Sequence, residues 1–282
     1  AVSNKQQDTS SSSTDGRYVP SASNAQTRQK TAISPRTTTG RQASNSITVK
    51  TDVLSMAINP MTGDLVGAGL NNYPVSLSNP KEIVEMLSNS AGSLYELQSG
   101  VIGDNGSKPI ALHAQQSHYE LQPGQDKLTV ALTGTADGVT VQKTYVFYRG
   151  KYNADLVTKV SNHGQQGWTG QVYQQITRQN VPSSTHHIRS YEGAAIASPQ
   201  TPYQKLSYKD MDTSPLQKEI LGGWAAMQQP YFVTAWIPPA QKKYDYYTHV
   251  TQSKDGSADI YTVGYMGKGV TLASGKSLQE KS

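Results

Sequence analysis

Short segments in which apolar and polar residues alternate, separated by turn sequences, constrain the fold of this chain most. The segments 127–134, 139–148 and 154–162 each alternate in this way. Asp137-Gly138, between the first two, favours the positive φ angles of a tight hairpin. Such segments recur at intervals of roughly 10–15 residues, which is typical of antiparallel sandwiches and barrels. The pattern predicts an all-β fold.

Residues 1–46 differ in composition from the rest of the chain. They are rich in Ser, Thr and Gln, and their six basic residues face only Asp8 and Asp15. A segment with so few large apolar side chains cannot offset the entropy lost on ordering. We therefore expect a disordered Ser/Thr/Gln-rich tether over 1–46 and a folded domain over 47–282, where the alternating pattern begins at Ile47.

The overall composition excludes several kinds of site and partner. The chain has no cysteine, so disulfides, thiolate metal sites and a cysteine nucleophile are excluded. Much of the net charge of +5 sits in the tether, whose scattered basic residues lack interleaved aromatic residues and argue against nucleic-acid binding. They are typical of a solvated tail, with a position beside anionic lipid headgroups as the alternative. No apolar run reaches the ~18–20 residues of a membrane span.

Two segments have features of short helices. Asn79-Pro80 has the residue types of a helix cap and a first helical position, although the residues that follow also suit a strand. The segment 214–221 is the second candidate. The sequence thus predicts one or two short helices in an otherwise all-β fold.

The most apolar stretch of the chain is 222–239, which contains two of the three tryptophans. Gly222-Gly223 allows a sharp bend ahead of Trp224. Beyond this bend, apolar residues occupy both alternating faces of 231–237, which predicts a central strand buried on both sides. A ligand pocket beneath Trp224 is the alternative.

The histidines give no compelling metal site. His186-His187 resembles a metal-binding pair, but adjacent side chains of an extended chain point to opposite faces. His113 and His118 are five residues apart and fail the same test on a strand. The sequence therefore predicts no metal ligands.

The carboxylates and tyrosines give no compelling catalytic site. Asp210 and Asp212 would share a strand face, and with Glu192 they would mimic the carboxylate pair of a glycosidase. The tyrosines within 244–247 suit either sugar stacking or cross-strand packing, and the packing role is favoured. The chain has neither a phosphate-binding glycine motif nor a nucleophile elbow. We therefore predict no catalytic and no cofactor-binding residues.

Four blocks of sequence carry a more specific pattern. The last block, GGWAAMQQPYFVTAWIP, holds most of the signature residues, and another has Arg149-Gly150 at a turn. The signature residues of the last block are Gly222, Gly223, Trp224, Tyr231, Phe232 and Trp236. The four blocks lie at 47–74, 143–162, 191–212 and 222–238. In this order they resemble the large periplasmic domain of the YidC family of bacterial inner-membrane protein insertases.

The resemblance implies a fold and a location. The fold would be an antiparallel β-supersandwich, similar to that of galactose mutarotase. The domain would lie at the periplasmic face of the inner membrane of a Gram-negative bacterium, between the first and second membrane helices of a longer protein. Insertase activity in this family belongs to membrane helices that these 282 residues do not include.

The resemblance also implies partners. The domain would be non-catalytic and would contact the Sec translocon accessory subunits SecD and SecF, or nascent inner-membrane proteins. We expect the contact surface within 174–222, which we interpret as a region with few strands, and we expect Tyr191, Tyr203 and Tyr208 to take part. The alternative is a carbohydrate-binding or aldose-epimerase-like β-sandwich.

Overall fold

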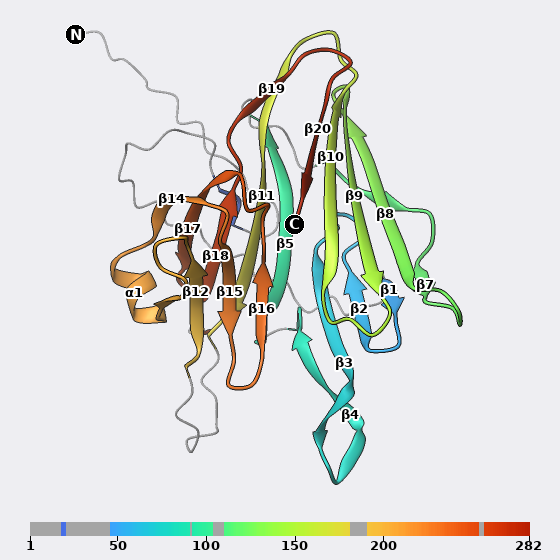
Figure 1. Cartoon of the computed structure of the whole chain (residues 1–282), viewed down its shortest axis with the longest axis vertical. Coiled ribbons are helices and arrows are strands. Elements are labelled where there is room, and N and C mark those ends of the chain that lie inside the picture. Colours follow the sequence, from blue (N-terminus) through green and yellow to red (C-terminus); the bar gives the residue numbers. More distant parts are fainter. Residues whose placement is uncertain (1–17, 21–45, 91, 104–109, 181–190, 254–256) are drawn as a thin grey trace, which may run out of the picture.

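The computed structural model describes residues 18–20, 46–90, 92–103, 110–180, 191–253 and 257–282 (Figure 1). Within these residues the chain forms three β-sheets and one short helix. The predicted all-β fold is therefore confirmed. None of the described helical segments is both long and apolar enough to cross a bilayer.

The largest sheet extends across the whole molecule. Its strands are β1 (Ile47–Lys50), β2 (Leu54–Ile58), β3 (Leu65–Ser76), β4 (Asn79–Leu87), β5 (Tyr95–Gly103), β7 (His118–Glu120), β11 (Trp168–Gln179), β14 (Gln217–Leu221), β17 (Lys243–Thr251), β18 (Ile260–Met266) and β19 (Val270–Leu272). The main order is β14-β17-β18-β11-β5-β3-β2-β1-β7, with β19 added to β11 and β4 to β3. Pairing is antiparallel except between β1 and β7, which run parallel.

A five-stranded sheet covers one half of the large sheet, on the right in Figure 1. Its strands are β6 (His113–Ala114), β8 (Lys127–Ala136), β9 (Val139–Tyr148), β10 (Ala154–Asn162) and β20 (Ser277–Lys281). The order is β20-β10-β9-β8-β6. Burial alternates along β8, β9 and β10 as the sequence predicts. Asp137 and Gly138 join β8 to β9 with φ angles of 50° and 77°, as a tight hairpin requires.

A small sheet covers the other half, on the left in Figure 1. Its strands are β12 (Gly193–Ala197), β13 (Gln204–Leu206), β15 (Trp224–Gln228) and β16 (Val233–Trp236), in the order β13-β12-β15-β16. The helix α1 (Tyr208–Thr213) lies beside it. The large sheet thus forms two sandwiches side by side, one with each smaller sheet.

The helix predictions are corrected in two places. The segment 214–221 is not helical, because Gln217–Leu221 pairs with β17 as strand β14. The residues after Asn79-Pro80 form strand β4, which is the alternative that their sequence left open. The observed helix α1 has a start signal that the sequence analysis missed, a capping box between Ser207 and Asp210.

Polar side chains tie the five-stranded sheet to the large sheet through the core. The ammonium of Lys143 on β9 donates to the carbonyls of Thr62 (2.6 Å) and Ser99 (2.8 Å). It also lies 3.8 Å from the Asp64 carboxylate, and the two side chains are only 2% and 4% exposed. The Tyr145 hydroxyl, two residues further along β9, donates to the carbonyl of Gly63 (2.7 Å). These bonds hold the turn between β2 and β3 against β9.

Candidate interaction surface on the small sheet

The strand β16 exposes one apolar face to solvent. Tyr231 is 74% exposed, Val233 58% and Ile237 62%, and Ala235 between the last two is also exposed. We call these four residues the β16 stripe. The predicted central strand buried on both sides is therefore wrong. The physical reason is that β16 is the edge strand of the small sheet, paired only with β15 among the described strands.

The opposite face of the same strand is anchored in the core. Trp236 is buried, and its indole N–H donates to the carbonyl of Gln175 on β11 (3.0 Å). Phe232 packs partly buried against the core. Because successive strand residues point to opposite faces, anchoring Trp236 inward turns Val233, Ala235 and Ile237 outward in the observed register.

The register of the small sheet places residues of the neighbouring strands on the same face as the stripe. Ala235 lies directly opposite Ala226 on β15, which lies opposite Ala195 on β12. Trp224 alternates with Ala226 along β15 and so shares this outward face. The Tyr203 ring lies 6.1 Å from the Trp224 ring. Ala226 and Ala195 are fully buried, so the exposed part of this face consists of the β16 stripe, Tyr203 and part of Trp224.

Of the three tyrosines predicted to contact a partner, Tyr203 is exposed and lies on this face. The Tyr191 hydroxyl is engaged within the fold, because it donates to the Ala194 carbonyl (2.5 Å) and accepts from the Leu206 N–H (3.0 Å). Burial raises the pKa of Tyr191 to about 12. Tyr208 on α1 packs its ring 4.4 Å from that of Tyr261. Tyr203 is the one exposed member of this group, and its hydroxyl donates to the side chain of Gln228.

The region 174–222 has more regular structure than the sequence suggests. It contains the end of β11 and the elements β12, β13, α1 and β14, while 181–190 lie outside the described residues. The interpretation as a region with few strands is therefore wrong. Short strands such as β13, of three residues, carry too few side chains for their alternation to be recognised.

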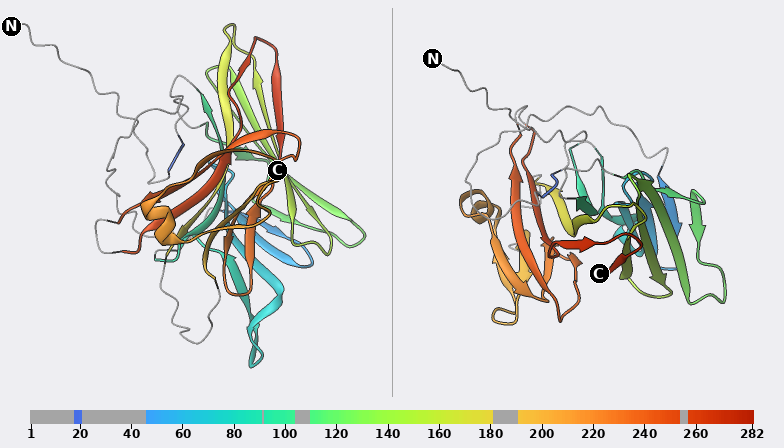
Figure 2. Two further views of the ribbon diagram at one scale, coloured as in Figure 1. Left: turned by 60° about the vertical axis from the view of Figure 1, so that its left-hand side comes forward. Right: turned by 90° about the horizontal axis from the view of Figure 1, so that it is seen from above.

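A projecting hairpin adds apolar surface next to the β16 stripe. The β3–β4 hairpin extends beyond the rest of the molecule in Figures 1 and 2, and Leu77 near its tip is 95% exposed. At its base the Tyr73 ring lies 5.7 Å from that of Tyr152 and 6.0 Å from that of Phe232. Phe232 directly follows Tyr231 of the stripe. The sequence analysis missed this surface, because it considered Asn79-Pro80, just after Leu77, as a possible helix start.

The remaining signature residues act in turns. Gly222 and Gly223 have φ angles of 61° and 84°, which confirms the predicted bend ahead of Trp224. The Arg149 guanidinium donates to the carbonyls of Gln125 (2.9 Å) and Gln122 (2.8 Å). The N–H of Gly150 donates to the carboxylate of Asp52 (2.9 Å). All of these contacts are made within the chain's own turns.

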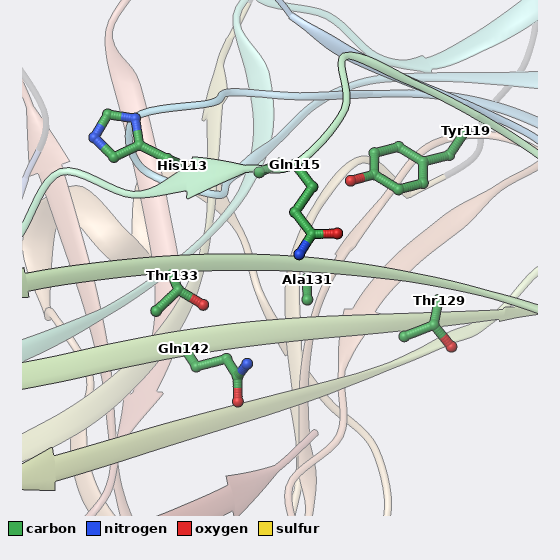
Figure 3. A pocket seen from close by; sticks show the side chains of 8 residues that line it. His113, Gln115, Tyr119, Thr129, Ala131, Thr133 and Gln142 are labelled. Atoms are coloured by element: carbon green, nitrogen blue, oxygen red, sulfur yellow. The ribbon is translucent and has the colours of Figure 1, made fainter.

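A cavity of about 440 Å³ lies against the outward face of β8 (Figure 3). It is lined by His113, Ala114, Gln115, Tyr119, Thr129, Ala131, Thr133 and Gln142. In Figure 3 the amide of Gln115 points toward Ala131, and the Tyr119 hydroxyl points toward Gln115. The lining has one histidine and no carboxylate, so it lacks the acid–base pair that an epimerase needs. Trp224 does not line this cavity.

The other residues considered for chemistry have structural partners. Asp210 caps α1, and Asp212 accepts from the Tyr261 hydroxyl (3.1 Å), so their predicted place on a strand face is wrong. Glu192 pairs with Arg178 (3.5 Å). His118 lies 2.8 Å from the Thr48 hydroxyl. His186 and His187 are outside the described residues. Within the described part of the chain, no three His, Asp or Glu residues are placed to hold a metal ion.

The tyrosines of 244–247 are buried in the fold, as the packing interpretation predicts. Tyr244 hydrogen-bonds to Glu280 on β20, which joins the large sheet to the five-stranded sheet. The Tyr246 hydroxyl donates to the carbonyl of Gly222 (2.7 Å), at the predicted bend. The Tyr247 hydroxyl donates to the side chain of Gln175 (2.6 Å).

Comparison with solved structures shows the fold. The chain superimposes on a galactose mutarotase related enzyme from Lactobacillus acidophilus with a TM-score of 0.50. The match covers 84% of this chain and 95% of that one, at 9% sequence identity. At this identity the likeness concerns the fold alone and does not bring an enzymatic activity with it.

Comparison with known sequences shows the family. The membrane protein insertase YidC of Coxiella burnetii is 42% identical over 234 residues, which is 81% of this chain and 41% of that protein. The insertase YidC of Legionella pneumophila is 35% identical over 269 residues, 92% of this chain and 47% of that protein. The chain thus spans less than half the length of these relatives. A family model described as the YidC periplasmic domain matches residues 46–282. This protein therefore belongs to the YidC periplasmic domain family of Gram-negative bacteria and lies in the periplasm.

Proposed function

We propose that this chain is the non-catalytic periplasmic part of a membrane protein insertase, and that it supports insertion and folding of inner-membrane proteins by binding them or the Sec accessory subunits SecD and SecF. The family match and the names of the relatives support the setting. The β16 stripe is the observation that supports a binding role. Exposed contiguous apolar residues are typical of interaction sites in soluble domains.

The geometry of β16 suits an extended apolar ligand. An edge strand offers unpaired backbone groups to which a peptide can add as a further strand. The side chains of the stripe alternate at the spacing of such a strand, with Tyr231, Ile237 and Val233 the most exposed. The membrane-spanning segments of inner-membrane proteins are predominantly apolar. We therefore propose that the stripe contacts these segments.

The first test places charge on the stripe. In the whole insertase, Val233→Lys with Ile237→Lys is expected to reduce crosslinking to a nascent inner-membrane protein about tenfold, which corresponds to ~1.4 kcal/mol of binding free energy. Both side chains are exposed, so the fold should keep its thermal midpoint. The control is Thr129→Lys with Thr133→Lys on the exposed face of β8. Equal crosslinking in both double variants would exclude the stripe as the contact.

The second test addresses the Sec subunits. We expect chemical-shift changes in residues 191–222 when the soluble periplasmic part of SecF is added, with Tyr203→Ala weakening the binding about tenfold because exposed aromatic residues dominate many interfaces. The control is His113→Ala, an exposed ring on the other smaller sheet. A panel of hexoses serves as the test of the carbohydrate alternative. Saturable shifts with a hexose and none with SecF would reverse the proposal.

A further inference from the structure

The segment Tyr18–Pro20, in the middle of the predicted tether, lies against the large sheet. The Tyr18 ring stacks on His249 of β17, with centroids 3.7 Å apart and planes 11° apart. The same ring lies 6.0 Å from that of Tyr247. Pro20 is buried, while Val19 between them is 43% exposed. Twenty-six residues separate Pro20 from the first strand, so the position of this segment does not follow from chain connectivity.

A buried amide on the sheet is arranged to receive this segment. Gln175 on β11 is 0% exposed. Its side-chain oxygen accepts from the Tyr247 hydroxyl (2.6 Å), which fixes the orientation of the amide. Its nitrogen donates to the Gln98 side chain (2.7 Å) and to the carbonyl of Tyr18 (2.9 Å). An amide nitrogen has two N–H groups, and the carbonyl of Tyr18 takes the second. Without an acceptor there, a buried donor would be left unpaired, which is costly.

The side chains that contact Tyr18 lie close together on one face of the large sheet. His249, Gln175 and Tyr247 point to one face of the large sheet, since His249 and Tyr247 are two apart on β17 and Gly264 lies opposite both Tyr247 and Gln175. A Cβ on Gly264 would lie 2.6 Å from the Cβ of Gln175. The absence of a side chain at Gly264 therefore leaves space for these side chains to lie close together. The surface therefore presents a ring, a hydroxyl and an oriented amide within one small area.

We propose that this face of the large sheet is a docking surface for the chain's own Tyr18–Pro20 segment, which clips the predicted tether to the folded residues. The consequence is a shorter reach. A chain spans at most about 3.5 Å per residue, so residue 1 can lie about 160 Å from Ser46 when the whole tether is free. When Tyr18 is docked, only 17 residues separate residue 1 from the sheet, and the reach falls to about 60 Å. The clip thereby limits how far the domain can move from the start of the tether.

The test compares Tyr18→Ala with Tyr18→Phe in the complete 282-residue chain. Phenylalanine keeps the ring and the backbone carbonyl, so docking should persist, whereas alanine removes the stacking. Because the chain has no cysteine, Val19→Cys gives a unique attachment point for a nitroxide label. We expect the label to broaden the amide resonances of His249 and Thr262 in the parent and Tyr18→Phe chains. In the Tyr18→Ala chain these resonances should be sharp.

The titration of His249 gives an independent readout. Burial lowers the pKa of His249 in the docked state, since the charged ring would be desolvated. Release of the segment should therefore raise this pKa toward the ordinary histidine value in Tyr18→Ala, while Tyr231→Ala, a control on the small sheet, leaves it unchanged. His249→Gln assigns the resonance among the six histidines. The proposal would be overturned if the label did not broaden these resonances in the parent chain. It would also be overturned if His249 had the same pKa in the parent and Tyr18→Ala chains.

Discussion

Replacing Lys143 by methionine is expected to lower the free energy of unfolding by about 3–5 kcal/mol, because it leaves the buried Asp64 carboxylate without its cation. The same change leaves the carbonyls of Thr62 and Ser99 without the donor that joins β9 to the large sheet. Methionine matches the length of the lysine stem, so little of the effect comes from lost packing. Denaturant unfolding followed by tryptophan fluorescence measures the difference.

Two further variants identify the cause of this effect. Lys159→Met on the neighbouring strand β10 changes an exposed lysine and should alter stability by less than about 0.5 kcal/mol. In the Lys143→Met background, Asp64→Asn removes the stranded charge but keeps an oxygen for the Ser99 N–H, which the carboxylate accepts at 3.0 Å. The double variant should regain about 1 kcal/mol or more of the loss. A double variant less stable than Lys143→Met would show that the charge pair is not the source.

The second large effect is expected at the bend ahead of Trp224. Gly223→Ala should destabilise the domain by about 3 kcal/mol or more, since two costs add. Gly223 has a φ of 84°, where a residue with a Cβ is strained by about 1–3 kcal/mol. A Cβ there would also lie 2.3 Å from the backbone oxygen of Ala197, so β12 would have to move. Thermal unfolding measured by circular dichroism reports the change.

Gly150→Ala is the matched control for this prediction. Gly150 has a similar φ of 67°, but a Cβ at this position meets no atom within 4 Å. The control should therefore show the conformational strain alone, about 1–2 kcal/mol. If Gly223→Ala and Gly150→Ala cost the same, β12 moves away from the new methyl group without loss, and the close approach of the two strands is not a constraint.

Local sequence predicted those parts of the fold whose cause is local. The strands β8, β9 and β10 follow one another through short turns, so alternation and turn chemistry in one segment suffice to define them. Asp137-Gly138 specifies its hairpin through its own backbone preferences. The small helix was missed because its six residues are too few to show a helical period. Its one sequence signal was the capping pair Ser207 and Asp210.

The exposure of the β16 stripe was missed because exposure depends on what covers a strand. The apolar residues of 231–237 are compatible with burial on both faces, and nothing in their own sequence says which sheet edge they form. Trp236 determines which face points inward, because its indole N–H donates to the carbonyl of Gln175 across the sandwich. The two residues are 61 positions apart in the sequence. Once that face is anchored inward, Val233 and Ile237 face outward, with no described layer above them.

The sequence by itself determined the fold class, the bend at Gly222-Gly223 and, through its blocks, the family, since each depends on neighbouring residues or on their order. The tertiary structure alone decided which apolar residues stay exposed and where the Tyr18–Pro20 segment contacts the large sheet. The hydrogen bond from Gln175 to Tyr18 joins positions 157 residues apart. Such contacts depend on which strands lie close together in space, and neighbouring residues in the sequence do not determine this.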